Sequence, residues 1–131
     1  MEYSTNSHCK YLIAVHLIFV VKYRKPLLNG QVAEFTKQTI LDLQDVSEFK
    51  VIEIEVDNDH LHMLLSITPN ISISQHVRLI KQKTNYALWN RFKWLKQHFW
   101  NEKTFWSDGY FVCSVGNASA ETVKRYIQEQ G

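Results

Sequence analysis

The sequence predicts an α+β fold of the ferredoxin-like kind, a split βαβ antiparallel sheet with helices on one face. Strand and helix patterns follow one another in the order β-α-β-β-α-β, and a C-terminal helix comes last. The chain has 131 residues, of which 45% are hydrophobic, and this is enough apolar material for one core. Only four Gly and two Pro are present, and no linker or repeat is visible. We therefore expect a single domain over residues 1–131.

The first half of the chain predicts a strand followed by a helix. Residues 10 to about 22 are dense in Ile, Val, Leu and Phe, as in a buried strand. Residues 22–26 should end this strand, and Asn29-Gly30 should form a turn. From residue 31 to about residue 48, apolar side chains recur near helical spacing, at Val32, Phe35, Ile40 and Leu43.

The next pattern is a hairpin followed by a long helix. Residues 51–56 alternate apolar with acidic side chains, which predicts a strand with one dry and one wet face. Residues 57–59 have turn chemistry, and residues 60–67 predict the partner strand. A helix is expected from residue 71 to about residue 92, capped by Ser72 or Ser74.

The C-terminal part predicts a loop, a fourth strand and a last helix. The loop is aromatic, and we expect Trp94, Trp100 and Trp106 to fill the core rather than stack on bases. Residues 110–115 predict the fourth strand. Ser119 is expected to cap a helix of about residues 119–130.

Composition argues against secretion and membrane insertion. Cys9 and Cys113 lie far apart and show no metal-binding or disulfide spacing. The polar, acid-containing N-terminus does not resemble a secretory signal. The longest apolar run, residues 11–21, is interrupted by His16 and is too short to span a bilayer. We expect a cytoplasmic protein with no membrane partner.

Charge is unevenly distributed although the net charge is only +2. Residues 31–62 are predominantly acidic, whereas residues 76–103 are predominantly basic. Such asymmetry is typical of a surface that faces a polyanion, although charge runs are also found on solvated helix faces. The side chains that we expect to contact DNA phosphates are Arg24, Lys25, Arg78, Lys81 and Lys83.

Two histidines alternate along the predicted strand 60–67. His60 and His62 should point away from the core face, with Cα atoms about 6–7 Å apart, so both rings can reach one cation. Acidic residues of the neighbouring strand should lie on the same face, and Asp59 precedes the pair. These carboxylates can accept the second ring N–H of a metal-bound imidazole. The alternative is a pair of ordinary surface histidines.

The predicted last helix carries Val123, Tyr126, Ile127 and Gln130 on one face. A phenol with a pKa near 10 is a poor nucleophile at neutral pH. It attacks a phosphodiester only where a cation polarises the phosphate. Two imidazoles and an amide oxygen suit Mg²⁺ or Mn²⁺ better than structural zinc. The alternative is an amphipathic packing helix with Tyr126 at its edge.

The chain resembles the small single-tyrosine HUH transposases of hairpin-ended insertion sequences, the TnpA family of IS200-like elements. HUH denotes the pattern histidine, bulky hydrophobe, histidine. The resemblance runs nearly end to end, and it is carried by His16 to Phe19, Lys22-Tyr23-Arg24-Lys25, Glu55 to His62, Lys81 to Thr84, Phe105-Trp106, Tyr110-Phe111 and Val123 to Gln130.

This resemblance implies an activity and a set of roles. It implies that Tyr126 is the nucleophile, that His60 and His62 bind Mg²⁺ or Mn²⁺, and that Gln130 is the third ligand. It implies cleavage and rejoining of single-stranded DNA through a 5′-phosphotyrosine, with recognition of subterminal hairpins. It also implies a prokaryotic homodimer whose active sites are shared between chains.

Some positions depart from the family pattern, and other functions compete. Phe19, Val21 and Asn58 differ from common family residues, but none of them is an inferred ligand. A replication initiator or relaxase would need further domains. A domesticated, non-mobilising hairpin-binding nuclease is an open alternative. A non-catalytic nucleic-acid-binding module would need stacking aromatics where this sheet has histidines and acids.

Overall fold

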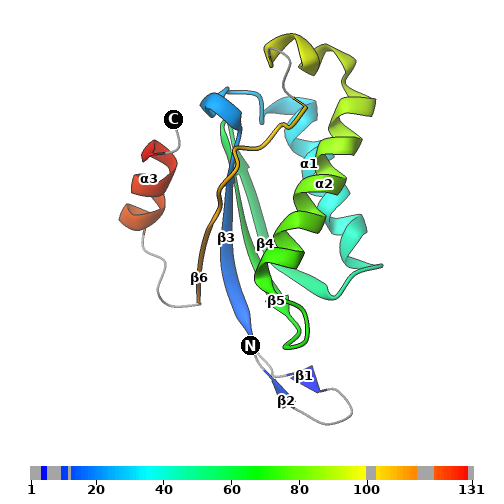
Figure 1. Cartoon of the computed structure of the whole chain (residues 1–131), viewed down its shortest axis with the longest axis vertical. Coiled ribbons are helices and arrows are strands. Elements are labelled where there is room, and N and C mark those ends of the chain that lie inside the picture. Colours follow the sequence, from blue (N-terminus) through cyan, green and yellow to red (C-terminus); the bar gives the residue numbers. More distant parts are fainter. Residues whose placement is uncertain (1–3, 6–9, 12, 100–102, 115–119, 130–131) are drawn as a thin grey trace.

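The computed structural model describes residues 4–5, 10–11, 13–99, 103–114 and 120–129. Its centre is a four-stranded antiparallel sheet in the order β4-β5-β3-β6 (Figure 1). This strand order is the ferredoxin-like arrangement that the sequence predicts. The strands are β3 (Ala14–Val20), β4 (Phe49–Asp57), β5 (His60–Ile67) and β6 (Phe111–Ser114).

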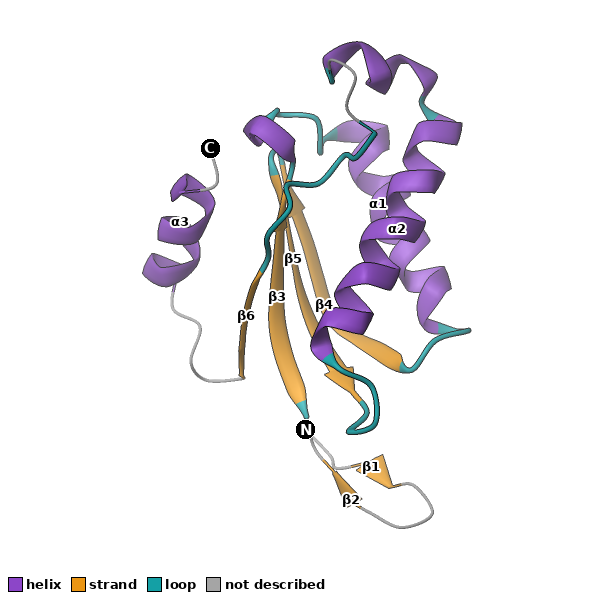
Figure 2. Ribbon diagram, viewed as in Figure 1, coloured by secondary structure: helices purple, strands orange, loops and turns teal. Residues whose placement is uncertain are grey.

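Helices lie on both sides of this sheet. α1 (Gly30–Gln44) and α2 (Ile73–Arg91) cover one face, whereas α3 (Ala120–Glu129) lies on the opposite side, as Figure 2 shows. The core fills the space between the sheet and α1 and α2. No described helix is long and apolar enough to cross a membrane. The bulkiest buried core side chains are Leu17, Phe19, Leu28, Ile40, Phe49, Leu61, Met63, Leu65, Ile80, Phe105 and Trp106.

The first predicted strand, residues 10 to 22, is divided in the structure. β2 (Lys10–Tyr11) pairs with β1 (Ser4–Thr5) in a separate two-stranded sheet, and only β3 joins the main sheet. β3 ends before a 3₁₀ turn, η1 (Lys22–Arg24). Tyr23 and Arg24 have φ angles of 61° and 50°, a left-handed conformation that a strand cannot contain.

α1 is shorter than predicted at its C-terminal end. Gly30 is its first residue, with φ of 53°, so the expected Asn29-Gly30 turn forms the helix start. The helix ends at Gln44 rather than near residue 48. The chain must turn there, because Phe49 is fully buried at the start of β4 while Val46 remains 83% exposed.

β4 and β5 form the predicted hairpin. The bounds of β5 match the sequence pattern, and Asn58 takes a φ of 60° in the connecting turn. The pairing of β4 with β5 shifts between Val51 and Glu53, where β4 contains a β-bulge.

α2 begins with a capping box. The Ser72 hydroxyl accepts the backbone N–H of Gln75, and the Gln75 side chain accepts the backbone N–H of Ser72. Ser72, and not Ser74, is therefore the cap. Ser119, the expected cap of the last helix, lies outside the described residues.

The aromatic loop divides between core and surface. Trp106 is 1% exposed, as predicted, and its indole N–H donates to the Thr84 hydroxyl at 2.8 Å. The prediction is wrong for Trp94, which is 45% exposed on the short helix η2 (Lys93–His98). Trp100 lies outside the described residues.

Candidate active site

His60 and His62 lie on the sheet face away from α1 and α2. Leu61 and Met63 alternate with them along β5 and are fully buried in the core on the other side. The histidine rings are half-buried. The predicted separation of a core face and a histidine face is therefore confirmed.

Carboxylates flank both histidines. Glu55 pairs with His62 across β4 and β5, and Asp57 pairs with His60, so both carboxylates share the histidine face. Asp59 contacts the ring of His60, with its Oδ1 atom 3.1 Å from Nδ1. An ionised carboxylate can only accept, so the Nδ1 atom of His60 carries the proton. A neutral His60 then keeps a lone pair on Nε2, as a metal ligand requires.

A third imidazole belongs to this cluster. His16, on β3, places its Nδ1 atom 2.8 Å from Nε2 of His62, and the two ring centroids are 5.0 Å apart. Burial and the neighbouring His16 lower the pKa of His62, whereas Glu55 and Glu53 oppose that shift. His16 is not among the site residues that the sequence predicts. The available signal was its position in β3, where it alternates with the core residues Val15 and Leu17.

Tyr126 of α3 lies on the same side of the sheet. Its ring centroid is 5.5 Å from that of Phe111. Phe111 pairs with Ile18, and Ile18 pairs with His62, so a single transverse row leads from the tyrosine contact to the histidine. Two strand spacings separate Phe111 from His62, which is about 10 Å between Cα atoms.

The hydroxyl of Tyr126 is buried, and it has no hydrogen-bond partner among the described residues. Burial raises the pKa of this phenol above its ordinary value. A buried hydroxyl without a partner is costly in a folded protein. The partner of this hydroxyl must therefore come from outside the described residues.

Among the described residues, α3 contacts its own chain through Tyr126 and Gln128. Besides the Phe111 contact, Nη1 of Arg24 donates to the carbonyl oxygen of Gln128 at 3.5 Å. The expectation of active sites shared between chains would place this helix on a partner. In the single chain it covers its own sheet, where Ile18 and Val20 are 0% exposed on the histidine side of β3.

The predicted phosphate contacts do not gather at one place in the fold. Arg78 and Lys83 are exposed on α2, on the other side of the sheet, whereas Arg24 and Lys25 lie at the end of β3. The ammonium of Lys81 donates to three backbone carbonyls, those of Ser107, Asp108 and Gly109, at 2.7, 3.2 and 2.8 Å. These bonds use all three of its protons.

Lys81 therefore has a structural role, which replaces the expected phosphate contact. Its ammonium also lies 5.3 Å from the centre of the Phe19 ring. Burial lowers the pKa of Lys81 to about 8, and Asp108 opposes that shift. The lysine thus ties the segment before β6 to α2.

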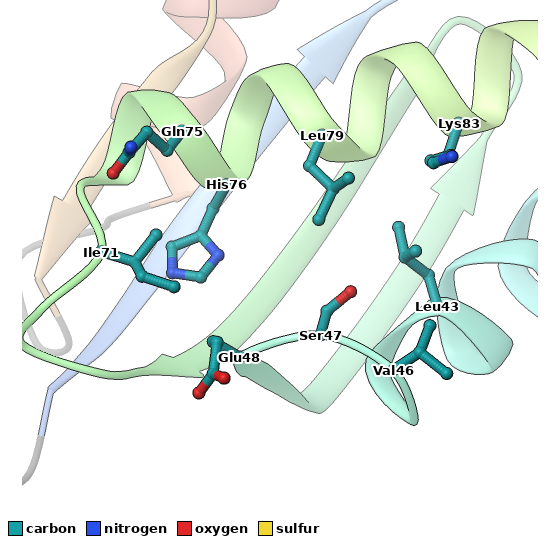
Figure 3. Close-up of a pocket in the computed structure, with 9 residues that line it drawn as sticks. All are labelled: Leu43, Val46, Ser47, Glu48, Ile71, Gln75, His76, Leu79 and Lys83. Atoms are coloured by element: carbon teal, nitrogen blue, oxygen red, sulfur yellow. The ribbon is translucent and has the colours of Figure 1, made fainter.

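A pocket of about 430 Å³ lies on the helix side and is separate from these histidines. Figure 3 shows the His76 ring directed from α2 toward the chain segment around Glu48. The Nε2 atom of His76 is buried and lacks a hydrogen-bond partner among the described residues. Burial lowers the pKa of His76, and Glu48 opposes the shift. The lining residues are Leu43, Val46, Ser47, Glu48, Ile71, Gln75, His76, Leu79 and Lys83.

The histidine face presents two imidazoles on one strand rather than a complete metal cage. Within the described ranges, no group of three or more His, Cys, Asp or Glu side chains is arranged to hold a metal ion. Gln130, the expected third ligand, lies outside these ranges. His60, with Nδ1 held by Asp59, nevertheless has the tautomer of a metal ligand, so the residues present fit a cation that keeps positions for water or phosphate.

Comparison with known sequences matches nearly the whole chain to one family. The family model described as "Transposase IS200 like" matches residues 9–130. The ISDra2 transposase TnpA of Deinococcus radiodurans is 32% identical over 120 residues, which cover 92% of this chain and 85% of that protein. The transposase for insertion sequence element IS200 of Salmonella typhimurium is 32% identical over 126 residues, covering 96% of this chain and 79% of that protein.

Comparison with solved structures gives the same result. A crystal structure of a putative transposase from Deinococcus radiodurans R1 superposes with a TM-score of 0.89 and 28% identity, covering 97% of both chains. A REP-associated tyrosine transposase bound to a REP hairpin superposes with a TM-score of 0.57 and 13% identity. It covers 94% of this chain and 68% of that one. The second likeness concerns the fold alone.

Proposed function

This chain belongs to the IS200-like transposase family, and from that membership we propose that it cleaves and rejoins single-stranded DNA at the ends of an insertion sequence. One observation carries the assignment of the site. Tyr126 lies on the histidine face of the sheet, and its buried hydroxyl has no partner among the described residues.

In the proposed reaction, the Tyr126 oxygen attacks the scissile phosphorus. The new phosphorus–oxygen bond makes a 5′-phosphotyrosine, and the bond to the 3′ oxygen breaks, so that this strand leaves with a free 3′-OH. The phenol loses its proton as the bond forms, and the departing 3′ oxygen gains one. Attack by another 3′-OH on the phosphotyrosine reverses these changes and joins new DNA ends. The phosphoester energy is conserved, so no external energy source is needed.

We propose that the reaction depends on Mg²⁺ or Mn²⁺ held by His60 and His62, with Gln130 as the third ligand. Such a cation polarises the scissile phosphate and stabilises the charge that develops on it. Asp59 supports this role, because its carboxylate fixes the tautomer of His60. The raised pKa of Tyr126 also favours a cation, because the buried phenol is neutral at physiological pH.

The proposed substrate is single-stranded DNA with a subterminal hairpin. A related fold has been solved with a REP hairpin bound, which supports this class of partner. Arg24, Lys25, Arg78 and Lys83 remain proposed phosphate contacts, and Lys81 does not, because carbonyl groups hold its ammonium. We place the activity in the cytoplasm of a prokaryotic cell, associated with the nucleoid.

We further propose a homodimer whose active sites combine the histidines of one chain with the tyrosine helix of the other. The contacts of α3 with Phe111 and Arg24 are compatible with this arrangement. Exchange of an identical element between two chains preserves its contacts and only transfers them to the partner. Either way, α3 covers the histidine face of a sheet.

Incubation with hairpin-bearing single-stranded DNA and Mg²⁺, analysed on a denaturing gel, tests the proposal. The native chain should form a slowly migrating protein–DNA adduct, and EDTA should abolish it. Tyr126→Phe should form no adduct while still binding the hairpin. An adduct formed by Tyr126→Phe would show that another residue is the nucleophile. Hairpin binding without any adduct by the native chain would instead favour a non-mobilising hairpin-binding protein.

A further inference from the structure

We propose that His16 is a third histidine of this site and that it competes with the divalent cation for the Nε2 atom of His62. The inference rests on the proposed function, because it concerns the cation that His60 and His62 would hold. It makes His16 a positioning residue, which acts through His62 rather than on the DNA.

The contact between His16 and His62 occupies a ring nitrogen of His62. Nδ1 of His16 lies 2.8 Å from Nε2 of His62, so one of these nitrogens carries a proton and the other accepts it. If Nε2 of His62 accepts, its lone pair is used. If it donates, it is protonated. In both cases this nitrogen cannot bind a cation until the contact with His16 opens.

His60, the other proposed ligand, has its hydrogen bond on Nδ1 and not on Nε2. His60 uses Nδ1 for its contact with Asp59, and this leaves Nε2 as the nitrogen with a free lone pair. One imidazole is thus ready to bind a cation, whereas the other is held by a third histidine.

The strand register shows the direction of this contact. His16 pairs with Leu64, which is two residues beyond His62 on the side away from His60. The Nε2 atom of His62 is therefore directed toward the Leu64 end of β5. In agreement, the described residues contain no group of three or more His, Cys, Asp or Glu side chains arranged to hold a metal ion.

The geometry also favours competition over a ligand role for His16. The nitrogens of His16 and His62 are 2.8 Å apart while the ring centroids are 5.0 Å apart, so the two rings meet edge to edge through these nitrogens, with an angle of 30° between their planes. The Nε2 atom of His62 is therefore directed at His16. Loading the site then requires His62 to exchange His16 for the cation.

Binding of Mn²⁺ to the full chain without DNA, followed by the electron paramagnetic resonance signal of free Mn²⁺, tests the inference. His16→Phe keeps an aromatic ring but removes the nitrogen, and His16→Ala removes it without adding volume. Both should bind Mn²⁺ about fivefold more tightly than the native chain, the effect of one lost hydrogen bond. His16→Asn, which keeps a polar group near the Nδ1 position, should stay close to the native affinity.

Two controls distinguish the ways in which the experiment can fail. His98→Phe makes the same chemical change at an exposed histidine beside Trp94 and should leave Mn²⁺ binding unchanged. His60→Ala should weaken binding. If the native chain and His60→Ala bind Mn²⁺ equally, the proposed cation site is wrong. If His60→Ala weakens binding but His16→Phe and His16→Ala bind equally or more weakly than the native chain, only the competition is wrong.

A metal-free measurement provides a second readout. Two-bond ¹⁵N–¹H correlation spectra should show a hydrogen-bonded Nε2 in His62 of the native chain. The ¹⁵N shift of that atom should move in His16→Phe and return toward the native value in His16→Asn. Identical His62 signals in all three proteins would overturn the inference whatever the metal affinities are.

Discussion

The ring of Tyr126 packs against the ring of Phe111, with centroids 5.5 Å apart and an angle of 46° between the planes. Phe111 belongs to the strand next to β3, so this contact joins the tyrosine helix to the sheet that carries the histidines. Whether the two rings come from one chain or from two decides how the active site is assembled.

Mixed dimers of two inactive variants should recover cleavage. Tyr126→Phe chains retain the histidines, and His60→Ala chains retain the tyrosine, so a mixed dimer with exchanged helices has one complete site. With random pairing, about a quarter of all sites should be active. The measurement is adduct formation after co-expression with two different tags. Failure of co-purified mixed dimers to form adduct would show that each site is built within one chain.

Lys81→Met should destabilise the fold by about 1–2 kcal/mol, because it removes three hydrogen bonds to the segment before β6. Lys83→Met changes an exposed lysine of the same helix and should alter the free energy of unfolding by less than about 0.5 kcal/mol. Urea denaturation of both variants measures the difference. Equal stabilities would mean that the carbonyl contacts of Lys81 contribute nothing.

Thr84→Val should cost about 1–3 kcal/mol of unfolding free energy. The substitution keeps the volume of the side chain but removes the acceptor of the buried Trp106 indole N–H. The matched control is Thr36→Val, because Thr36 is equally buried but its hydroxyl only donates to the Val32 carbonyl. Thermal or urea unfolding should show a larger loss for Thr84→Val than for Thr36→Val, and the reverse order would contradict the assignment.

His76 should make the fold sensitive to mild acid. Its side chain is 2% exposed, and burial lowers its pKa below the ordinary value of about 6.5. The unfolded chain therefore binds a proton at a higher pH than the folded chain does. The contribution of His76 to the free energy of unfolding is fully present above pH 6.5. It decreases as the pH falls toward the pKa of the folded state, by up to about 1.4 kcal/mol per pH unit.

The acid sensitivity of His76 can be isolated by comparing variants. Unfolding free energies of the native chain and of His76→Gln, measured between pH 5 and 8, should differ in slope only below about pH 6.5. His98→Gln, at an exposed histidine, should keep the native slope. A native slope in His76→Gln would assign the acid sensitivity to another group.

Local patterns predict the sheet well because they record which side chains are buried. The alternation of His60, Leu61, His62 and Met63 gives both the strand and its two faces, and the structure agrees. The pattern also predicts that residues 22–26 end the first strand, and β3 does end before η1. It does not predict the division into β2 and β3, because residues 11–21 form one nearly continuous apolar run. The surface position of Trp94 is likewise absent from the pattern.

The contacts of the site depend on pairs that are distant in sequence. His16 reaches His62 diagonally across β3 and β5, and no spacing within one strand indicates that register. From the sequence alone, Lys81 is a candidate phosphate contact. The fold shows that the carbonyl groups of segment 107–109 bind its ammonium instead. Single residues can thus be nominated from their chemistry, but their partners follow only from the fold.

The bulge between Val51 and Glu53 limits which mutations the strand can tolerate. Before the bulge the odd-numbered residues Phe49 and Val51 face the core, and after it the even-numbered residues Ile54 and Val56 do. The extra residue Ile52 therefore reverses which alternate residues face the core. That change directs Glu55 and Asp57 toward the histidines. Deletion of Ile52 would remove the bulge. Either Phe49 would then leave the core, or Glu55 and Asp57 would face away from the histidines. Lineages that keep both the core and the site should therefore tolerate substitution at position 52 but not its deletion.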